Sequence, residues 1–468
     1  MRREASETTL FLLAKIKLNN YINSMKQIFC HFLIILLALT SSAQAQSFSF
    51  IRDAELEHTL RQMTNPILKQ AGLVPENVNL FIIGSDDINA FVAGGQNIFI
   101  FTGLIKAMTE PDMLMAVLAH ETGHIAGGHL ARGTEKLKNA QFGSILGFVL
   151  GVAAAAAGAP DAGAAVLSGS NHLVGRSFLA FTRSNEQAAD QAALGYLDAL
   201  NISAEGMVET FEVLSRNQRS ALRKIDQYAI THPLSSTRIT HAENHLARST
   251  IPKGQYPKEM TEPYARLVAK LYSFTEPAPK TFVKYPASDT SIAARMARAV
   301  ALHKQANTQQ ALETMESVVA ERPKDGFLHE LHGQLLFESG HIDKAREAYE
   351  RANKLRSNQP LIMTALSEVY LATKDKTHNR QAINLLERAI SKDRNNASSF
   401  RLLATAYGRK GELGLSHLAL AEQAALRGDA GEIDHNVRLA LTALPEASPG
   451  RLRAEDLKRV AQEIRNNE

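Results

Sequence analysis

The sequence predicts a mainly α-helical protein, in which a globular domain of helices with a small β-sheet precedes an α-solenoid of helical repeats. The C-terminal half favours helices, because it is rich in Ala, Leu, Glu, Lys and Arg, and it contains a repeat with a period near 34 residues. Short runs of β-branched and aromatic residues between positions 78 and 101 predict the strands. A chain of 468 residues is long enough for two domains and a targeting segment.

Residues 1–45 have the three parts of a secretory signal. Met25-Lys26 is a short positive start, Ile28 to Thr40 is an apolar stretch, and Ala43-Gln44-Ala45 is a small-residue cleavage site. We expect the chain to start at Met25 and to be cleaved after Ala45. An uncleaved membrane anchor is the alternative, although the apolar stretch is shorter than the roughly 20 residues that a membrane span needs.

Cysteine content and charge exclude several kinds of site. The only cysteine, Cys30, lies in the signal segment, so the mature chain would have no disulfide and no thiolate ligand. The net charge is +4, and residues 1–45 hold five basic and two acidic residues, so about +1 remains for the rest. Such a balance offers no basic surface for nucleic acid, and none is expected as a partner.

Periodic apolar patterns and turn residues predict the elements of the N-terminal domain. Helices are expected at 50–75, from Pro111 to about Ala126, at 184–200 and at 203–217, and strands at 78–83, 89–95 and 97–101, the last two paired around a glycine turn. Proline is dense between Pro233 and Pro286, which predicts a boundary region rather than a helical domain. The predicted divisions are a signal region at 1–45, the N-terminal domain at 46–265, a linker at 266–289 and the repeat domain at 290–468.

Residues 142–174 are small and apolar, and they are typical of two helices joined at Gly158–Pro160. Each run is too short and too rich in glycine for a membrane span. Two interpretations stay open for this segment: packed or lid-like helices, or a hairpin that makes peripheral contact with a membrane surface.

The repeat is marked by small residues at equivalent positions. Steps of 34, 37 and 34 residues separate Ala311, Ala345, Ala382 and Ser416. Four positions later stand the larger residues Met315, Tyr349, Leu386 and Leu420. Small residues at helix crossings beside a large one resemble the tetratricopeptide repeat, in which two antiparallel helices approach closely. An unrelated helical bundle is the alternative, and 430–444 and 452–466 are expected to be capping helices.

The motif His120-Glu-Thr-Gly-His124 is the chemical focus of the N-terminal domain. Residues four apart share one face of a helix, so both imidazoles can reach one metal ion. Glu121 is rotated by about 100° from His120, which places it beside the metal, where a base for a metal-activated water belongs. A surface cluster of polar residues is the alternative, but two adjacent buried histidines would be costly without a ligand.

A third ligand is needed for such a site. His129 lies about 140° around the helix from His124, so it is rejected as a ligand and interpreted as a surface residue or a residue in contact with a ligand. Glu186, on the next predicted helix, is the candidate. Asp190 lies one turn later on the same face, where it can accept from the free N–H of a ligand histidine. For both carboxylates, ordinary solvated helix charges are the alternative.

His232 precedes Pro233, which favours an extended backbone at the histidine. Two uses are open to its imidazole. It can bind the open metal position and latch the site, or it can swing away and donate to the oxyanion formed during peptide hydrolysis. A helix-capping histidine is the alternative without a chemical role.

These motifs resemble those of the M48 family of zinc peptidases. The resemblance rests on His120 to His124 followed by Glu186-Gln-Ala-Ala-Asp190, on Asn89-Ala-Phe91 with Gly94-Gly95, and on Thr231-His-Pro233 followed by Arg238-Ile239. It implies a gluzincin-like domain, peptide hydrolysis, and one Zn²⁺ per chain held by His120, His124 and Glu186, with Glu121 in catalysis. Asp190 and His232 complete the expected catalytic residues, for the reasons given above.

With a signal in front and repeats behind, the resemblance implies a metalloendopeptidase of the bacterial periplasm in the quality control and assembly of outer-membrane β-barrel proteins. Peripheral association with the outer membrane is left open. Expected substrates are unfolded or misassembled envelope proteins, which can pair as strands with Ile98–Phe101. The repeats are expected to recruit substrates or the outer-membrane β-barrel assembly machinery. Relatives often carry cysteines in the repeat domain, and their absence here puts a redox-linked role in doubt.

Two other functions stay open on the sequence. One is a chaperone-like binding scaffold whose peptidase site is mostly latched. The other is a membrane-associated housekeeping peptidase that uses 142–174 as an anchor. The intact metal-binding and base residues weigh against the scaffold.

Overall fold

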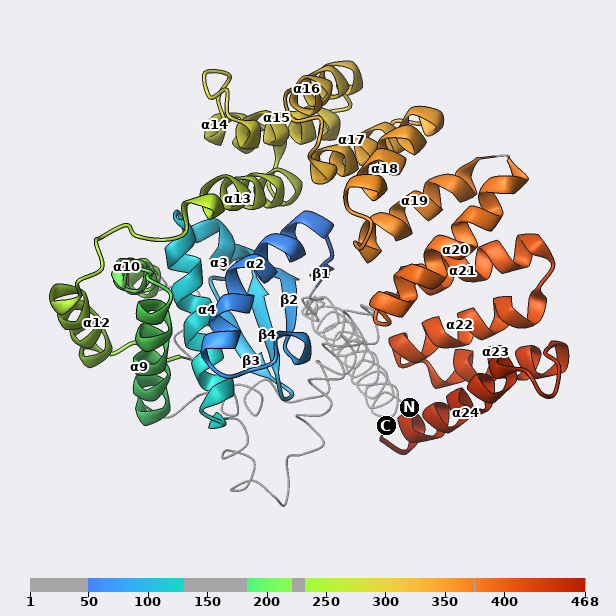
Figure 1. Ribbon diagram of the computed structural model, residues 1–468, viewed down its shortest axis with the longest axis horizontal. Coiled ribbons are helices and arrows are strands. Elements are labelled where there is room, and N and C mark those ends of the chain that lie inside the picture. Colours follow the sequence, from blue (N-terminus) through green and yellow to red (C-terminus); the bar gives the residue numbers. More distant parts are fainter. Residues whose placement is uncertain (1–48, 130–182, 221–231, 374, 468) are drawn as a thin grey trace, which may run out of the picture. The chain divides into compact units, whose positions relative to one another are not determined.

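The computed structural model describes residues 49–129, 183–220, 232–373 and 375–467 (Figure 1). The chain divides into two compact units, Met1–Gln46 and Ser47–Glu468, and every described element belongs to the second. The predicted signal and the apolar segment 142–174 lie outside the described residues. Among the helices that are described, none is long and apolar enough to cross a membrane.

Four short strands form one sheet: β1 (Ser49–Ile51), β2 (Asn79–Gly84), β3 (Ala90–Ala93) and β4 (Asn97–Phe101). Their order is β1-β2-β4-β3, with β2 and β4 parallel and the outer pairs antiparallel. Gly94 and Gly95 make the turn between β3 and β4 with φ of 58° and 95°, a left-handed conformation that glycine adopts without steric cost. The strand pair predicted around this turn is confirmed.

The predicted pairing of a substrate strand with Ile98–Phe101 is wrong. Strand β4 is hydrogen-bonded to β2 on one side and to β3 on the other, so both of its backbone edges are occupied. Its side chains alternate between the two faces of the sheet. Ile98 and Ile100 join the main core, whereas Phe99 and Phe101 join a separate aromatic cluster.

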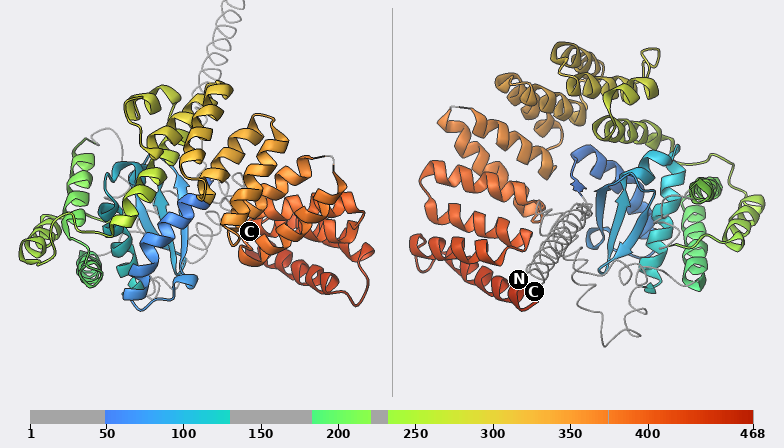
Figure 2. Two further views of the ribbon diagram at one scale, coloured as in Figure 1. Left: turned by 45° about the horizontal axis from the view of Figure 1, so that its top comes forward. Right: turned by 180° about the vertical axis from the view of Figure 1, so that it is seen from behind.

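Helix α4 (Pro111–Ala126) is the central helix of the N-terminal domain. It covers one face of the sheet together with α2 (Ala54–Gln70), and α9 (Arg183–Ala199), α10 (Glu205–Ser220) and α12 (Ser236–Arg248) lie beyond it (Figure 2). The shorter elements are the 3-10 turn η1 (Pro75–Asn77) and α3 (Thr102–Ala107). Pro111 suits a first helical position because its missing N–H is not needed there. Every residue of α4 as far as His124 is buried.

The region predicted as a linker, 266–289, is helical instead. It contains most of α13 (Thr261–Thr275) and all of α14 (Ala278–Lys284), which follow the 3-10 turn η2 (Lys258–Met260). Some of the prolines stand where helices begin: Pro277 is the N-cap of α14, and Pro263 lies in the first turn of α13. Proline removes no intrahelical hydrogen bond at those positions, so its density here was a misleading sign of a loop.

The repeat domain is a stack of antiparallel helix pairs, as predicted. Its helices are α15 (Ile292–Lys304), α16 (Thr308–Glu321), α17 (Gly326–Glu338), α18 (Ile342–Leu355), α19 (Pro360–Ala372), α20 (Lys376–Lys392), α21 (Ala397–Lys410), α22 (Leu413–Arg427), α23 (Ala430–Ala443) and α24 (Pro449–Asn467). Ala311, Ala345 and Ala382 are fully buried. Gly333 shows why such positions are small, since a Cβ there would lie 2.8 Å from the ring of Tyr349.

A buried group of charges joins the N-terminal domain to the first repeats. The ammonium of Lys270, on α13, lies 2.7 Å from Asp53 at the start of α2 and 3.0 Å from Glu330 on α17. Arg266, one turn earlier, binds Asp325 at 2.5 Å. Removing one partner from a buried group of this kind typically costs about 3–5 kcal/mol, because an unpaired charge is left inside the protein. The two domains therefore cannot be separated without a penalty at this junction.

Candidate metal centre

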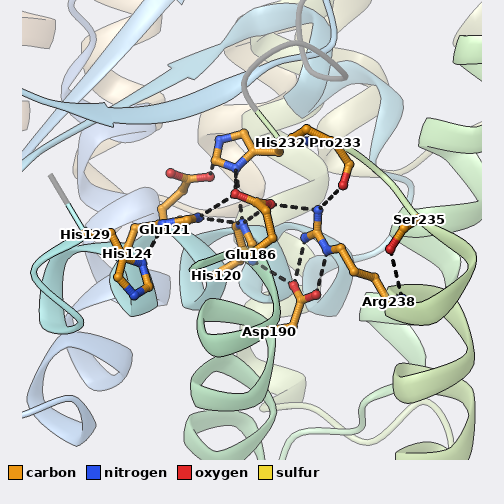
Figure 3. A network of polar contacts seen from close by, with 10 residues as sticks. All are labelled: His120, Glu121, His124, His129, Glu186, Asp190, His232, Pro233, Ser235 and Arg238. Carbon is orange, nitrogen blue, oxygen red and sulfur yellow. Dashed lines mark hydrogen bonds and ion pairs between the residues drawn. The ribbon is translucent and has the colours of Figure 1, made fainter. Parts of the chain in front are cut away.

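Four residues that can ligate a metal converge in the core of the N-terminal domain (Figure 3). His120 and His124 come from α4, Glu186 from α9 and His232 from the segment before α12, and their ligand atoms all lie within 4.8 Å of one another. Each of the four is 3% exposed or less. Polar groups buried this deeply need partners, so the alternatives that treated these residues as surface or solvated groups are wrong.

The approach of α9 to α4 depends on Gly123, inside the histidine motif. A Cβ on Gly123 would lie 2.9 Å from the carbonyl oxygen of Ala189 and 3.1 Å from its Cα. The missing side chain therefore lets the two helices come together. Glu186, one turn before Ala189, is brought beside both histidines as a result.

The donor atoms are spaced as ligands around one ion. His120 Nε2 lies 3.0 Å from His124 Nε2 and 3.3 Å from His232 Nδ1. Glu186 Oε1 lies 3.3 Å from His124 Nε2 and 3.2 Å from His232 Nδ1. Zinc holds four ligands at about 2.0–2.1 Å in a tetrahedron, whose edges are then about 3.3 Å. Three nitrogens and a carboxylate oxygen at these distances fit such an ion.

Each histidine of α4 has a partner for its other ring nitrogen. His120 Nδ1 lies 2.8 Å from Asp190 Oδ1, and His124 Nδ1 lies 3.0 Å from His129 Nδ1. A ring that donates through Nδ1 presents the lone pair of Nε2 to the cluster. His129 is 7% exposed, so the interpretation of it as a surface residue is wrong and contact with His124 is what the structure shows.

Glu121 lies beside the cluster, fully buried, with Oε1 3.5 Å from His232 Nε2. Among the described residues, neither of its carboxylate oxygens has a hydrogen-bond partner. Burial raises the pKa of Glu121 above its ordinary value, although His232 and His120 act in the other direction. A buried carboxylate with open acceptor positions and a raised pKa is suited to take up a proton.

The charges in the cluster favour a cation. Burial opposes ionisation of Glu186, yet His232, His120 and His124 outweigh it and lower its pKa. Burial likewise opposes the charge of Asp190, and Arg238 and His120 lower its pKa. Burial lowers the pKa of His124 to about 2, so this ring is neutral. Burial opposes a charge on His120, yet Asp190 and Glu186 raise the pKa of that ring to about 9, so a bound metal would displace a proton from it. With both carboxylates ionised and the imidazoles neutral, the donor set suits a divalent metal.

His232 is held at the cluster by the start of α12. Ser235 is the N-cap of that helix, so the interpretation of His232 as the cap is wrong. Arg238, in the first turn of α12, contacts Glu186, Asp190 and the carbonyl of Pro233. Its position six residues after His232 was noted in the sequence as part of a motif, but no contact could be assigned to it there.

Comparison with known proteins agrees with this geometry. Residues 51–246 match the model of Peptidase family M48. The Beta-barrel assembly-enhancing protease of Escherichia coli (strain K12) is 24% identical over 409 residues, which cover 87% of this chain and 82% of that protein. The Metalloprotease LoiP of the same strain is 25% identical over 240 residues, 46% of this chain and 89% of that protein. The Mitochondrial metalloendopeptidase OMA1 of Schizosaccharomyces pombe is 29% identical over 213 residues, 45% of this chain and 57% of that protein.

The chain is therefore a metallopeptidase, and its residues 51–246 are similar to Peptidase family M48. The match to the Beta-barrel assembly-enhancing protease extends beyond residues 51–246 into the helical repeats of this chain, because it covers 87% of the chain. The resemblance read from the sequence motifs is confirmed at the level of the family.

We expect Gly123→Ala to disrupt the metal centre, because the added methyl group would push α9 away from α4 and move Glu186. Metal content after purification should fall sharply, as should peptidase activity. Gly195→Ala is the matched control, since Gly195 lies on α9 with nothing within 4 Å of its Cβ position. That change should stabilise the helix by about 0.5–1 kcal/mol and leave metal content unchanged. Equal metal content in both variants would contradict the role given to Gly123.

Proposed function

We propose that this chain is a zinc-dependent endopeptidase of the bacterial periplasm, in which His120, His124 and Glu186 hold one Zn²⁺. The observation that carries the proposal is the convergence of these ligand atoms in a buried site with Glu121 beside them. Imidazole and carboxylate ligands are those of known catalytic zinc sites. Bound zinc would act as a Lewis acid that lowers the pKa of a water from 15.7 to about 7.

Residues of the chain supply the proton transfer and the orientation of the ligands. Glu121 is placed to accept the proton of the attacking water and to pass it to the leaving amine. Asp190 keeps Nδ1 of His120 protonated, so that Nε2 of the same ring is available as a ligand. Asp190 is therefore a functional residue of the proposed site.

We further propose that His232 is a latch. Its Nδ1 lies among the ligand atoms and its Nε2 faces Glu121, so it stands where a water would be activated. An imidazole in that place competes with water and holds the peptidase in a resting state. A latched site supports the second candidate function, a chaperone-like scaffold with little basal proteolysis, and the same protein can serve both functions if the latch opens.

The proposed substrates are unfolded or misassembled envelope proteins, and the proposed process is the assembly of outer-membrane β-barrel proteins. Similarity to the Beta-barrel assembly-enhancing protease over most of the chain supports this. The repeats supply a candidate recruitment site, a pocket of about 620 Å³ between α20, α21, α22 and α24. Its apolar lining includes Phe400, Leu403, Leu426 and Leu457, with Arg394 and Arg453 beside them. Such a surface suits an exposed apolar segment of an unfolded protein or of the assembly machinery.

Substitution of the ligand and of the base should separate zinc binding from catalysis. Glu186→Gln should lose most of the bound zinc, because a neutral amide is a much weaker ligand. Glu121→Gln should keep one zinc per chain and lose about 10²–10⁴-fold in activity, the usual contribution of a general base. Zinc content by elemental analysis and hydrolysis of casein measure the two effects. Full zinc and full activity in Glu186→Gln would refute the ligand assignment.

Removal of the latch should raise proteolysis. His232→Ala is expected to increase basal casein hydrolysis several-fold at unchanged protein concentration, because the imidazole no longer occupies the position of the water. His241→Ala, at an exposed position on α12, is the control and should behave as the wild type. Lower activity in a folded, zinc-loaded His232→Ala would identify an oxyanion donor instead, and unchanged activity would exclude both roles.

The repeat pocket is best tested by a point substitution, because deletion of the repeats would unpair the charges around Lys270. Leu426→Glu places a charge in the apolar pocket on α22 and should abolish turnover of native targets in cells. Hydrolysis of a short unstructured peptide should stay near the wild-type rate, because the metal centre is built from other elements. Leu413→Glu, at an exposed position on the same helix, is the control. Equal loss of both activities would show that the pocket is structural.

A further inference from the structure

One guanidinium group contacts three parts of the metal centre at once. Arg238 is 3% exposed, and its Nη1 lies 2.7 Å from Oε2 of Glu186. Its Nε and Nη2 donate to the two oxygens of Asp190 at 2.6 and 2.8 Å. Nη1 also donates to the carbonyl of Pro233 at 3.2 Å, next to His232 (Figure 3). The same side chain therefore touches the proposed ligand, the partner of His120 and the segment that carries the latch.

The charge of Arg238 is needed where it lies. Glu186 and Asp190 are one turn apart on α9, and both are buried, so they would repel each other without a cation between them. Among the described residues, Arg238 is the permanently charged group that the structure places against both carboxylates. The planar guanidinium group suits this position, because it binds Asp190 through two nitrogens and still reaches Glu186.

The contacts also divide the two oxygens of Glu186. Oε1 faces His124 Nε2 at 3.3 Å and His232 Nδ1 at 3.2 Å, whereas Oε2 lies closer to Arg238 Nη1, at 2.7 Å, than to His120 Nε2, at 3.5 Å. A carboxylate engaged in this way has one oxygen for a metal and one for the guanidinium. Loss of the guanidinium would leave both oxygens free to turn toward the ion.

We propose that Arg238 is a positioning residue of the metal centre, which holds Glu186 as a ligand through one oxygen and ties the His232 segment to it through the Pro233 carbonyl. This rests on the zinc site proposed above. Ligand geometry and latch position are then set by one side chain. Release of the His232 segment requires the bond to Pro233 to break or Arg238 to move with it.

The test compares Arg238→Gln, Arg238→Lys and the control Arg248→Gln in the full chain. Arg248 lies at the exposed end of the same helix and bonds only to the carbonyl of Asn244 among the contacts described. Two measurements do not depend on activity: zinc affinity by competition with a chromophoric chelator, and the visible absorption spectrum of the Co²⁺-substituted protein, whose intensity falls as the coordination number rises above four. Circular dichroism establishes that each variant is folded.

Arg238→Gln should weaken zinc binding by about 10–100-fold, the range found when a residue that orients a metal ligand is lost. Its Co²⁺ spectrum should weaken, as Glu186 binds through both oxygens and a water takes the place of His232, which makes five ligand atoms in place of four. Arg238→Lys keeps the charge without the planar guanidinium group, so it should recover part of the affinity, and Arg248→Gln should match the wild type. The wild-type affinity and spectrum in a folded Arg238→Gln would overturn the proposal. If Arg238→Gln does not fold, wild-type values in Arg238→Lys would overturn it equally. A wild-type chain that binds no zinc would instead refute the proposed function, and this inference with it.

Discussion

The close contact between α4 and α9 is the constraint on which the candidate site depends. His120 and His124 are on one helix and Glu186 is on the other, so the ligand set exists only if the two helices touch at this level. Gly123 permits that contact, because any larger residue would meet the backbone of Ala189. Gly123, which stands between the candidate ligands His120 and His124, is therefore part of the packing that creates the site.

The buried carboxylates around this contact lie against groups that stabilise their negative charge, with one exception. Asp190 and Glu186 are matched by Arg238 and by the histidines, so their ionised forms are tolerated inside the core. Glu121 has no such hydrogen-bonded match among the described residues, and burial raises its pKa. The difference in environment suits the two roles proposed for these side chains, in which Glu186 and Asp190 hold and orient and Glu121 exchanges a proton.

The repeats are joined to the metal centre by continuous packing. Lys270 and Arg266 tie α13 to the start of α2 and to α17, the third helix of the repeat domain. Helix α2 packs in turn against α4. The fold thus combines the metallopeptidase domain and the helical repeats in one compact unit.

The sequence by itself determined the helices, the hairpin, the repeat period and the histidine pair of the candidate site, because these depend on local spacing: a step of four positions from His120 to His124, or of 34 from Ala311 to Ala345. Glu186 was assigned through the resemblance to a known family. The prediction for the proline-rich segment was wrong, because proline occurs both at the start of helices and in loops. The prediction of β4 as an open edge was wrong, because the order of strands in a sheet does not follow from local sequence. The tertiary structure alone decided which residues meet across distant segments. His232 lies among the ligand atoms and Arg238 joins Glu186 to Asp190 because α12 packs near α9, and no spacing along the chain encodes that contact.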